Sequence, residues 1–103
     1  MKDENISVKT WRINGENVLA ACDAELLGKE FIQGELTLKV FVSFYHDEYV
    51  NEEEFVIYLR NATIINLVGK RVINIAIREG IVDKNNIIYI KSVPHAQAVY
   101  MLK

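Results

Sequence analysis

Apolar positions recur with a helix-like period over Ala62–Gly80, between two halves of the chain that look extended. On a helical wheel the apolar residues of this stretch share one broad face, which a sheet would cover. They are Ile64, Ile65, Val68, Val72, Ile75 and Ala76. Thr63 is placed to cap such a helix and Gly80 to end it. The pattern predicts one long helix, in which Gly69 indicates a kink or the close approach of another backbone.

The flanking halves are rich in residues that favour strands. Ile6–Ile13 and Val18–Cys22 are separated by Asn14-Gly15, and this pair between apolar stretches favours a tight hairpin turn. Apolar and polar residues alternate over Glu35–Ser43, which predicts a third strand. Residues 87–91 and 96–102 predict a final pair of strands, joined through a bend at 92–95.

Helix signals occur at two further places. Asn51 is followed three residues later by Glu54, which indicates a capping box and a helix over Glu52–Asn61. Asp23 is predicted to cap a short helical turn at residues 24–27, and residues 29–34 and 44–49 are predicted as a connector and a loop. The chain therefore reads as one α+β domain over residues 1–103. A small, mostly antiparallel sheet would combine the N-terminal hairpin, the third strand and the C-terminal strand pair, packed against two helices.

Composition narrows the class of protein. The 103 residues carry a net charge of −2, so bulk electrostatics does not favour nucleic acid and any such contact needs a local basic patch. Cys22 is the sole cysteine, which excludes an internal disulfide. Neither an apolar N-terminal segment nor an apolar run of membrane-spanning length occurs. The sequence predicts a cytoplasmic protein without a membrane span, a cofactor or a metal site.

One polar ridge follows from the predicted long helix. Asn66, Lys70 and Asn74 are spaced at i, i+4 and i+8, and Arg71 and Arg78 flank them. Such a ridge is either a solvated helix face or a surface that contacts phosphates or a partner.

Two residues are candidates for catalysis. Cys22 precedes Asp23 and a nearby Lys29, a setting that can activate a thiolate, although a lone cysteine at a strand end is also a usual core residue. His95 follows Pro94, whose ring stiffens the backbone. His95 is therefore a candidate general base or a reader of a ligand, or it satisfies local carbonyl groups.

Several blocks of the sequence resemble a known family. They are Ala21-Cys22-Asp23, Glu25-Leu26-Leu27-Gly28-Lys29, Ser43-Phe44-Tyr45, Ala62-Thr63-Ile64, Asn66-Leu67-Val68-Gly69-Lys70-Arg71, Gly80-Ile81-Val82-Asp83 and Val93-Pro94-His95-Ala96-Gln97. Together they are similar to the archaeal "domain of unknown function" family numbered 424. The resemblance implies a short, stand-alone archaeal protein and assigns no activity. It places Cys22, Asp23, Lys29, Tyr45, Asn66, Lys70, Arg71, His95 and Gln97 in the shared blocks.

Three functions are compatible with the sequence. The first is a non-catalytic module that binds RNA or a ribonucleoprotein of the translation apparatus, with the basic ridge on phosphates and Tyr45 stacked on a base. Its binding residues would be Lys29, Tyr45, Asn66, Lys70, Arg71, Asn74, Arg78, His95 and Gln97. The second is a small enzyme or ligand-binding protein, as a homodimer, whose pocket gathers Cys22, Asp23, Lys29 and His95. The third is a protein-binding scaffold with an acidic patch of Glu52, Glu53 and Glu54. We rank the RNA-binding module first.

Overall fold

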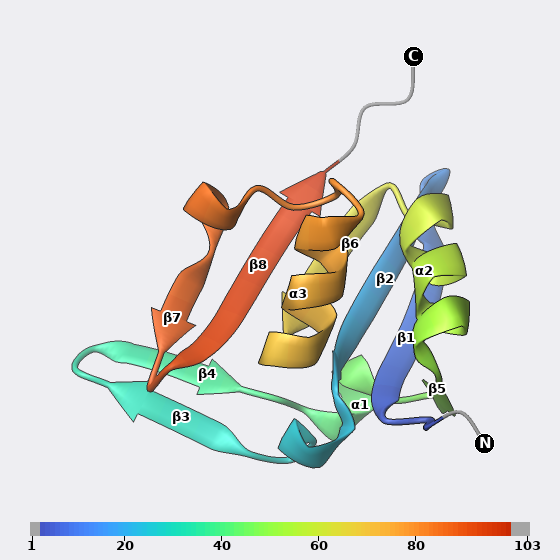
Figure 1. Ribbon diagram of the computed structural model, residues 1–103. Coiled ribbons are helices and arrows are strands. Elements are labelled where there is room, and N and C mark those ends of the chain that lie inside the picture. The colour runs from blue at the N-terminus through green and yellow to red at the C-terminus, as the bar shows by residue number, and fades with distance from the viewer. Residues whose placement is uncertain (1–2, 100–103) are drawn as a thin grey trace.

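The computed structural model describes residues 3–99, which form a six-stranded sheet and a separate two-stranded hairpin (Figure 1). The main sheet has the strand order β5-β1-β2-β6-β8-β7. Its strands are β1 (Ile6–Ile13), β2 (Glu16–Asp23), β5 (Glu48–Val50), β6 (Ile64–Val68), β7 (Ile88–Ile90) and β8 (Val93–Val99). β6 runs parallel to β2, and the other neighbouring strands of this sheet are antiparallel. The predicted α+β class with a mostly antiparallel sheet is confirmed.

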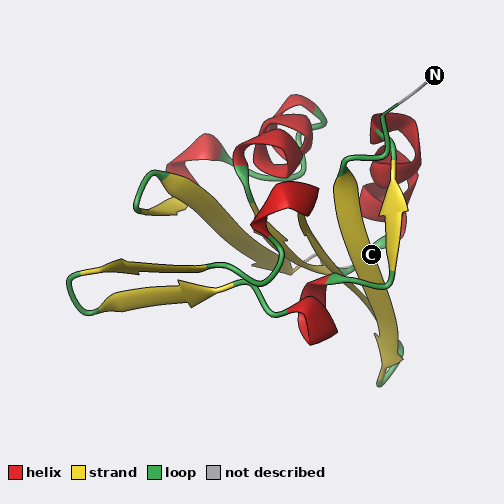
Figure 2. Cartoon of the chain, turned by 90° about the horizontal axis from the view of Figure 1, so that it is seen from below, coloured by secondary structure: helices red, strands yellow, loops and turns green. Residues whose placement is uncertain are grey.

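Two helices, α2 (Glu52–Asn61) and α3 (Lys70–Arg78), cover one face of the sheet (Figure 1). Phe55 of α2 and Val72 of α3 are fully buried in a single apolar cluster with Leu19, Ile65 and Leu67 of the sheet. The short helix α1 (Val42–Tyr45) lies on the opposite face (Figure 2). The predicted layer of two helices is therefore confirmed, and the face behind it is only partly covered.

The N-terminal hairpin and α2 follow the local sequence signals closely. Asn14 and Gly15 both have positive φ, as a type I′ turn requires, and Ile13 pairs with Glu16 across the turn. At the start of α2, the Asn51 side chain accepts a hydrogen bond from the Glu54 backbone N–H at 2.9 Å, and the Glu54 carboxylate accepts one from the Asn51 N–H at 3.1 Å. The capping box is confirmed.

The predicted long helix over residues 62–80 is wrong, because its first third is the strand β6 in the middle of the sheet. A central strand is covered on both faces, so it reads as a short apolar run without a clear period of two. Thr63 caps no helix, since its hydroxyl oxygen accepts a hydrogen bond from the Asn17 N–H at 2.9 Å. Gly80 does end α3, and its N–H donates to the carbonyl of Ile77 at 3.0 Å.

Gly69 is the residue before α3 and has a φ of 119°. A glycine has no side chain to cap the helix, and Asp23 at the end of β2 takes this role. Asp23 Oδ2 accepts from the Arg71 N–H and Oδ1 from the Val72 N–H, both at 3.0 Å. The prediction that Asp23 caps its own following turn is wrong, because the 3-10 turn Ala24–Leu26 receives no hydrogen bond from that side chain.

The predicted third strand lies outside the main sheet. It is β4 (Leu36–Lys39), which pairs with β3 (Glu30–Gln33), a strand in the stretch predicted as a connector. The two strands are adjacent in sequence and only Leu38 among their residues is buried, so they pair locally rather than in the core. The predicted loop at 44–49 contains the end of α1 and the start of β5.

The C-terminal strand pair forms as β7 and β8, but β8 starts at Val93 and thus includes three of the four residues predicted as a bend, while Ser92 lies in the turn between the two strands. The part of the predicted last strand beyond Val99 lies outside the described residues. Within residues 3–99, no helix has the length and apolar character needed to cross a lipid bilayer.

Candidate functional site

The predicted basic ridge is not a continuous feature of the structure. Asn66 lies on β6, and its side chain is on the face opposite α3, where it contacts Tyr45 and His95. Lys70 and Asn74 remain exposed on α3. Lys29 lies before β3 and lines a separate cavity of about 190 Å³ that also includes Lys39 and Phe41. The assignment of Asn66 to the ridge is therefore wrong, because the ridge assumed one helix where there is a strand.

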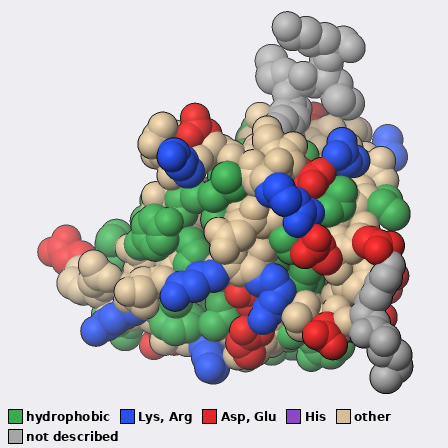
Figure 3. All heavy atoms as spheres, in the orientation of Figure 1, with side chains coloured by type: hydrophobic (Ala, Val, Ile, Leu, Met, Phe, Trp, Pro, Cys, Tyr) green, Lys and Arg blue, Asp and Glu red, His purple; other side chains and the backbone are tan. Residues whose placement is uncertain are grey.

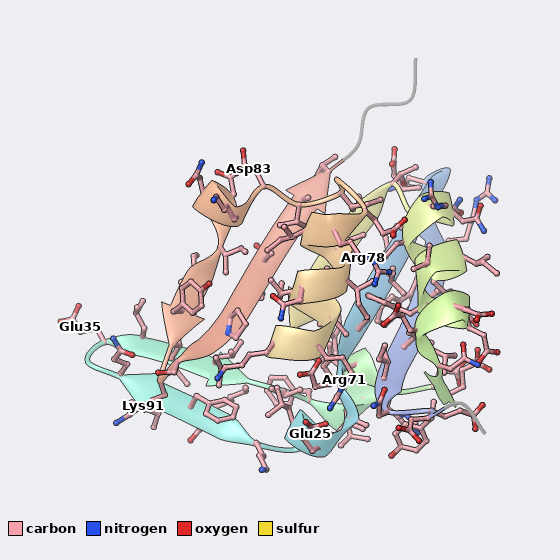
Figure 4. All side chains as sticks on the ribbon, in the orientation of Figure 1. Glu25, Glu35, Arg71, Arg78, Asp83 and Lys91 are labelled. Carbon is pink, nitrogen blue, oxygen red and sulfur yellow. The ribbon has the colours of Figure 1, made fainter. Side chains whose placement is uncertain are left out.

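Both arginines of the predicted ridge are paired with carboxylates. The Arg71 guanidinium lies 3.0 Å from Glu25 and 3.9 Å from Asp23, and it also donates to the carbonyl of Asn5. These contacts hold the N-terminal end of α3 against the turn after β2 (Figure 4).

Arg78, one helix length away, lies 2.9 Å from Glu52 and 3.2 Å from Glu79. On the helix-covered side, basic and acidic side chains are interspersed (Figure 3). The charge that a phosphate-binding ridge needs is thus largely neutralised by the protein itself. The carboxylates of the predicted acidic patch are likewise engaged within the protein, because Glu52 pairs with Arg78 and Glu54 caps its own helix.

The predicted pocket of Cys22, Asp23, Lys29 and His95 does not form. Cys22 and His95 lie on the same sheet face, but each pairs with Val68, so the intervening strand separates them by roughly 10 Å. Asp23 points to the opposite face, toward α3. Cys22 is fully buried, and burial raises the pKa of its thiol to about 12. A protonated, inaccessible thiol is a core residue and does not act as a nucleophile.

Three side chains on this second face, those of Tyr45, Asn66 and His95, form a hydrogen-bonded group. The Tyr45 hydroxyl donates to Asn66 Oδ1 at 2.6 Å, and His95 Nε2 lies 3.1 Å from the same oxygen. Tyr45 comes from α1, Asn66 from the central strand β6 and His95 from its neighbour β8. Three elements therefore fix one amide group.

The protonation state of the group follows from its surroundings. Burial lowers the pKa of His95, which favours the neutral imidazole. Because Asn66 Oδ1 is only an acceptor, the imidazole carries its proton on Nε2 and donates it. Asn66 then has its oxygen saturated by two donors, and its NH₂ group makes no hydrogen bond to any residue in the described part of the chain. The amide is held so that its donors are available.

Asn66 lines a shallow cavity of about 370 Å³ on this open face. The walls are mostly aliphatic and come from β2, β6 and β8, with Phe44 of α1 beside them. The lining residues are Val18, Phe44, Ile64, Ile65, Asn66, Gln97, Ala98 and Val99. Gln97 is exposed and pairs with Asn66 across the two strands, so two amides lie side by side on an apolar floor.

Aromatic residues border this cavity. Phe44 stacks on Trp11 of β1 with ring centroids 5.0 Å apart, and it packs at about a right angle to the ring of Tyr45, with centroids 4.9 Å apart. Lys9 Nζ lies 5.3 Å from the centroid of the Trp11 ring and donates to the Ser43 carbonyl at 2.7 Å. Tyr45 itself is 4 % exposed, so the prediction that it stacks on a base is wrong, whereas Phe44 is half-buried and lines the cavity.

Sequence reasoning found Tyr45, Asn66, His95 and Gln97 as candidates but did not bring them together. It missed the cavity residues Val18, Phe44, Ile64 and Val99, as well as Trp11 and Lys9. A strand assignment for residues 64–68 would have supplied the missing signal, because residues 64 and 66 then share a face with the alternate residues of β8.

The fold and this site define an α+β protein with one sheet face closed by helices and one that carries an open, polar-centred cavity. The chain belongs to the family "Protein of unknown function (DUF424)", whose model matches residues 11–101. Comparison with curated proteins finds no match. The fold is similar to that in the crystal structure of an uncharacterized conserved protein from Methanopyrus kandleri, with a TM-score of 0.77, 21 % identity and 95 % of each chain covered.

Proposed function

We propose that this protein is a non-catalytic module that binds single-stranded RNA within the translation apparatus, and that it does so through the open sheet face. The observation that carries the proposal is the fixed amide of Asn66, a residue that lines the cavity. Its oxygen accepts from Tyr45 and His95, and its NH₂ group makes no hydrogen bond to a described residue. Pre-organised donors of this kind suit the acceptor atoms on the edge of an unpaired base.

The surroundings of Asn66 fit a flat, partly apolar ligand. The Gln97 amide next to it supplies both a donor and an acceptor, Phe44 offers an aromatic ring, and Ile64 and Val99 form an aliphatic floor. Among the described residues that line the cavity there is no lysine or arginine. Binding would therefore depend on contacts with bases more than on contacts with phosphates.

The non-catalytic character is supported by the state of the candidate catalytic groups. Cys22 is a buried, protonated thiol. The imidazole proton of His95 is used to hold Asn66, and the side chain works as a positioning group.

The direct test is fluorescence anisotropy with labelled hexanucleotides of each of the four RNA bases. We expect one base to be preferred, with Gln97→Ala weakening its binding by roughly tenfold, as loss of one to two hydrogen bonds would. The matched control is Asn74→Ala, which removes an exposed amide from α3 on the other face. If Gln97→Ala and Asn74→Ala changed the RNA affinity equally, or if Lys70→Glu weakened binding instead, the RNA-binding surface would lie on the helix side of the sheet.

Salt dependence separates the two surfaces further. A base-reading cavity should lose little affinity between low and moderate salt, whereas a ridge contacting several phosphates loses it steeply, with a slope of roughly −0.7 per phosphate on single strands. Tyr45→Phe removes one of the two donors to Asn66 and should weaken binding while the protein stays folded. Unchanged affinity in that variant would argue against the fixed amide as the recognition element.

Association with the translation apparatus is tested by sedimentation of cell lysate through a density gradient. We expect the wild-type protein to comigrate with a ribosomal subunit and Gln97→Ala to shift toward the free fraction. Migration as free protein for both would remove the ribosome from the proposal and leave RNA binding to be judged by the anisotropy experiment.

A further inference from the structure

The outer edge of β1 is only half covered by another strand. β5 pairs with Ile6, Ser7 and Val8, and its first residue, Glu48, lies opposite Val8. Among the described residues, no strand lies beside the remaining part of this edge up to Ile13. A strand edge of this kind presents backbone donors and acceptors to whatever approaches it.

The register shows which backbone groups face outward. The carbonyl of Val8 accepts a hydrogen bond from the Asp47 N–H at 2.9 Å, so Val8 faces the β5 side. In an antiparallel ladder alternate residues face alternate neighbours. Thr10 and Arg12 therefore also direct their N–H and C=O groups outward, whereas Lys9 and Trp11 pair with β2.

A cavity of about 340 Å³ lies directly beside these outward groups. One wall is the free edge of β1 and the adjoining part of β2, and the other is the end of α2. Its lining residues are Thr10, Trp11, Arg12, Asn17, Val18, Leu19, Tyr58, Asn61 and Ala62. An added strand would thus have backbone partners along one side and a cavity for a side chain on the other, which is the arrangement used in β-strand addition.

One basic side chain at this edge has no ion-pair partner among the described residues. Arg60, Arg71 and Arg78 each pair with a carboxylate. Arg12, the remaining arginine, lines the cavity and is exposed, and it makes no ion pair with a described residue. On many edge strands, a charged side chain has no role beyond preventing aggregation. The cavity beside Arg12 favours a specific occupant instead.

We propose that the free edge of β1 binds an extended segment of a partner protein. The segment runs antiparallel to β1, in line with β5, and places an aspartate or glutamate opposite Arg12. This inference does not depend on RNA binding, because it uses the sheet edge rather than the open face.

The test is an NMR titration of isotope-labelled protein with two acetylated and amidated pentapeptides, DVTVT and KVTVT. With the aspartate peptide at millimolar concentration, the amide protons of Thr10 and Arg12 should shift and exchange more slowly with deuterium. The lysine peptide should bind roughly tenfold more weakly. Arg12→Glu should reverse this preference. The matched control is Lys70→Glu, which makes the same charge change on exposed α3 and should preserve it.

A second variant tests the backbone contacts. Thr10→Pro removes an outward N–H at an edge position that tolerates proline, so it should abolish binding of both peptides without unfolding the protein. Unaltered Thr10 and Arg12 amides, or a peptide preference that Arg12→Glu leaves unchanged, would overturn the proposal. A dimer in sedimentation equilibrium that Thr10→Pro dissociates would also overturn it, since the edge would then be occupied by a second copy.

Discussion

The carboxylate of Asp23 occupies the space that a side chain at Gly69 would need. A Cβ placed on Gly69 would lie 2.7 Å from each of the two Asp23 carboxylate oxygens. The close approach allows those oxygens to reach the N–H groups of Arg71 and Val72 at the start of α3. The end of β2, the end of β6 and the start of α3 are therefore joined at one point.

The first prediction concerns Gly69→Ala. The substitution should lower the free energy of unfolding by about 2–4 kcal/mol, because it combines a strained backbone with displacement of the Asp23 cap. Urea unfolding measures the loss. The control is Gly80→Ala, also at a positive φ but with nothing within 4 Å of the added Cβ, which should cost only about 1–2 kcal/mol. Equal costs at the two positions would show that crowding by Asp23 contributes nothing.

The second prediction concerns the titration of Asp23. Burial raises its pKa above 3.8, although the hydrogen bonds from Arg71 and Val72 act to lower it. Just above pH 3.8, the folded protein then binds more protons than the unfolded chain. The contribution of Asp23 to the free energy of unfolding is therefore complete below pH 3.8 and declines as pH rises through the pKa of the folded state. We expect the stability of the wild type relative to Asp23→Asn to fall as pH rises from about 3 toward 6. If the stability of the wild type relative to Asp23→Asn rose with pH, folding would lower the pKa of Asp23 rather than raise it.

The third prediction concerns His95. Burial lowers its pKa below 6.5, so the unfolded chain binds more protons just below that pH and the free energy of unfolding rises with pH through the window. The slope is at most about 1.4 kcal/mol per pH unit for one proton. His95→Gln retains an N–H that can donate to Asn66, but in this variant the rise of the free energy of unfolding with pH that is due to His95 should disappear. Gln97→Ala should keep the slope, and a flat wild-type profile would contradict the assignment.

The fourth prediction concerns Cys22. Its side chain is fully buried and its pKa is about 12, so a disulfide reagent should modify it only when the protein opens. Labelling of the native protein should be slow and should accelerate in urea in parallel with unfolding. Rapid labelling without denaturant would restore Cys22 as a candidate nucleophile.

Local signals in the sequence were sufficient where local interactions decide the structure. The turn at Asn14-Gly15 and the box formed by Asn51 and Glu54 each involve residues within a few positions of one another, and both are confirmed. The apolar pattern of residues 62–80 predicts a single helix wrongly, because an apolar run fits a buried strand as well as a helix. The deciding contact, Asp23 with the start of α3, joins residues nearly fifty positions apart.

In the candidate site, too, the sequence predicts individual residues but not the contacts between distant elements. Tyr45, Asn66, His95 and Gln97 were identified individually from their residue types and blocks. Their assembly depends on α1 and β8 meeting on β6, and no local pattern encodes that meeting. Arg71 and Arg78 show the converse, since an exposed cation in a sequence gives no sign of the distant carboxylate that will neutralise it.

The stacking of Trp11 on Phe44 gives the protein an intrinsic optical reporter. Trp11 is the sole tryptophan, it lines the cavity at the β1 edge, and its partner Phe44 lines the cavity on the open face. The emission of one indole therefore senses both surfaces. Fluorescence titration of unlabelled protein can therefore follow the binding of a nucleobase on the open face and the addition of a peptide strand at the β1 edge.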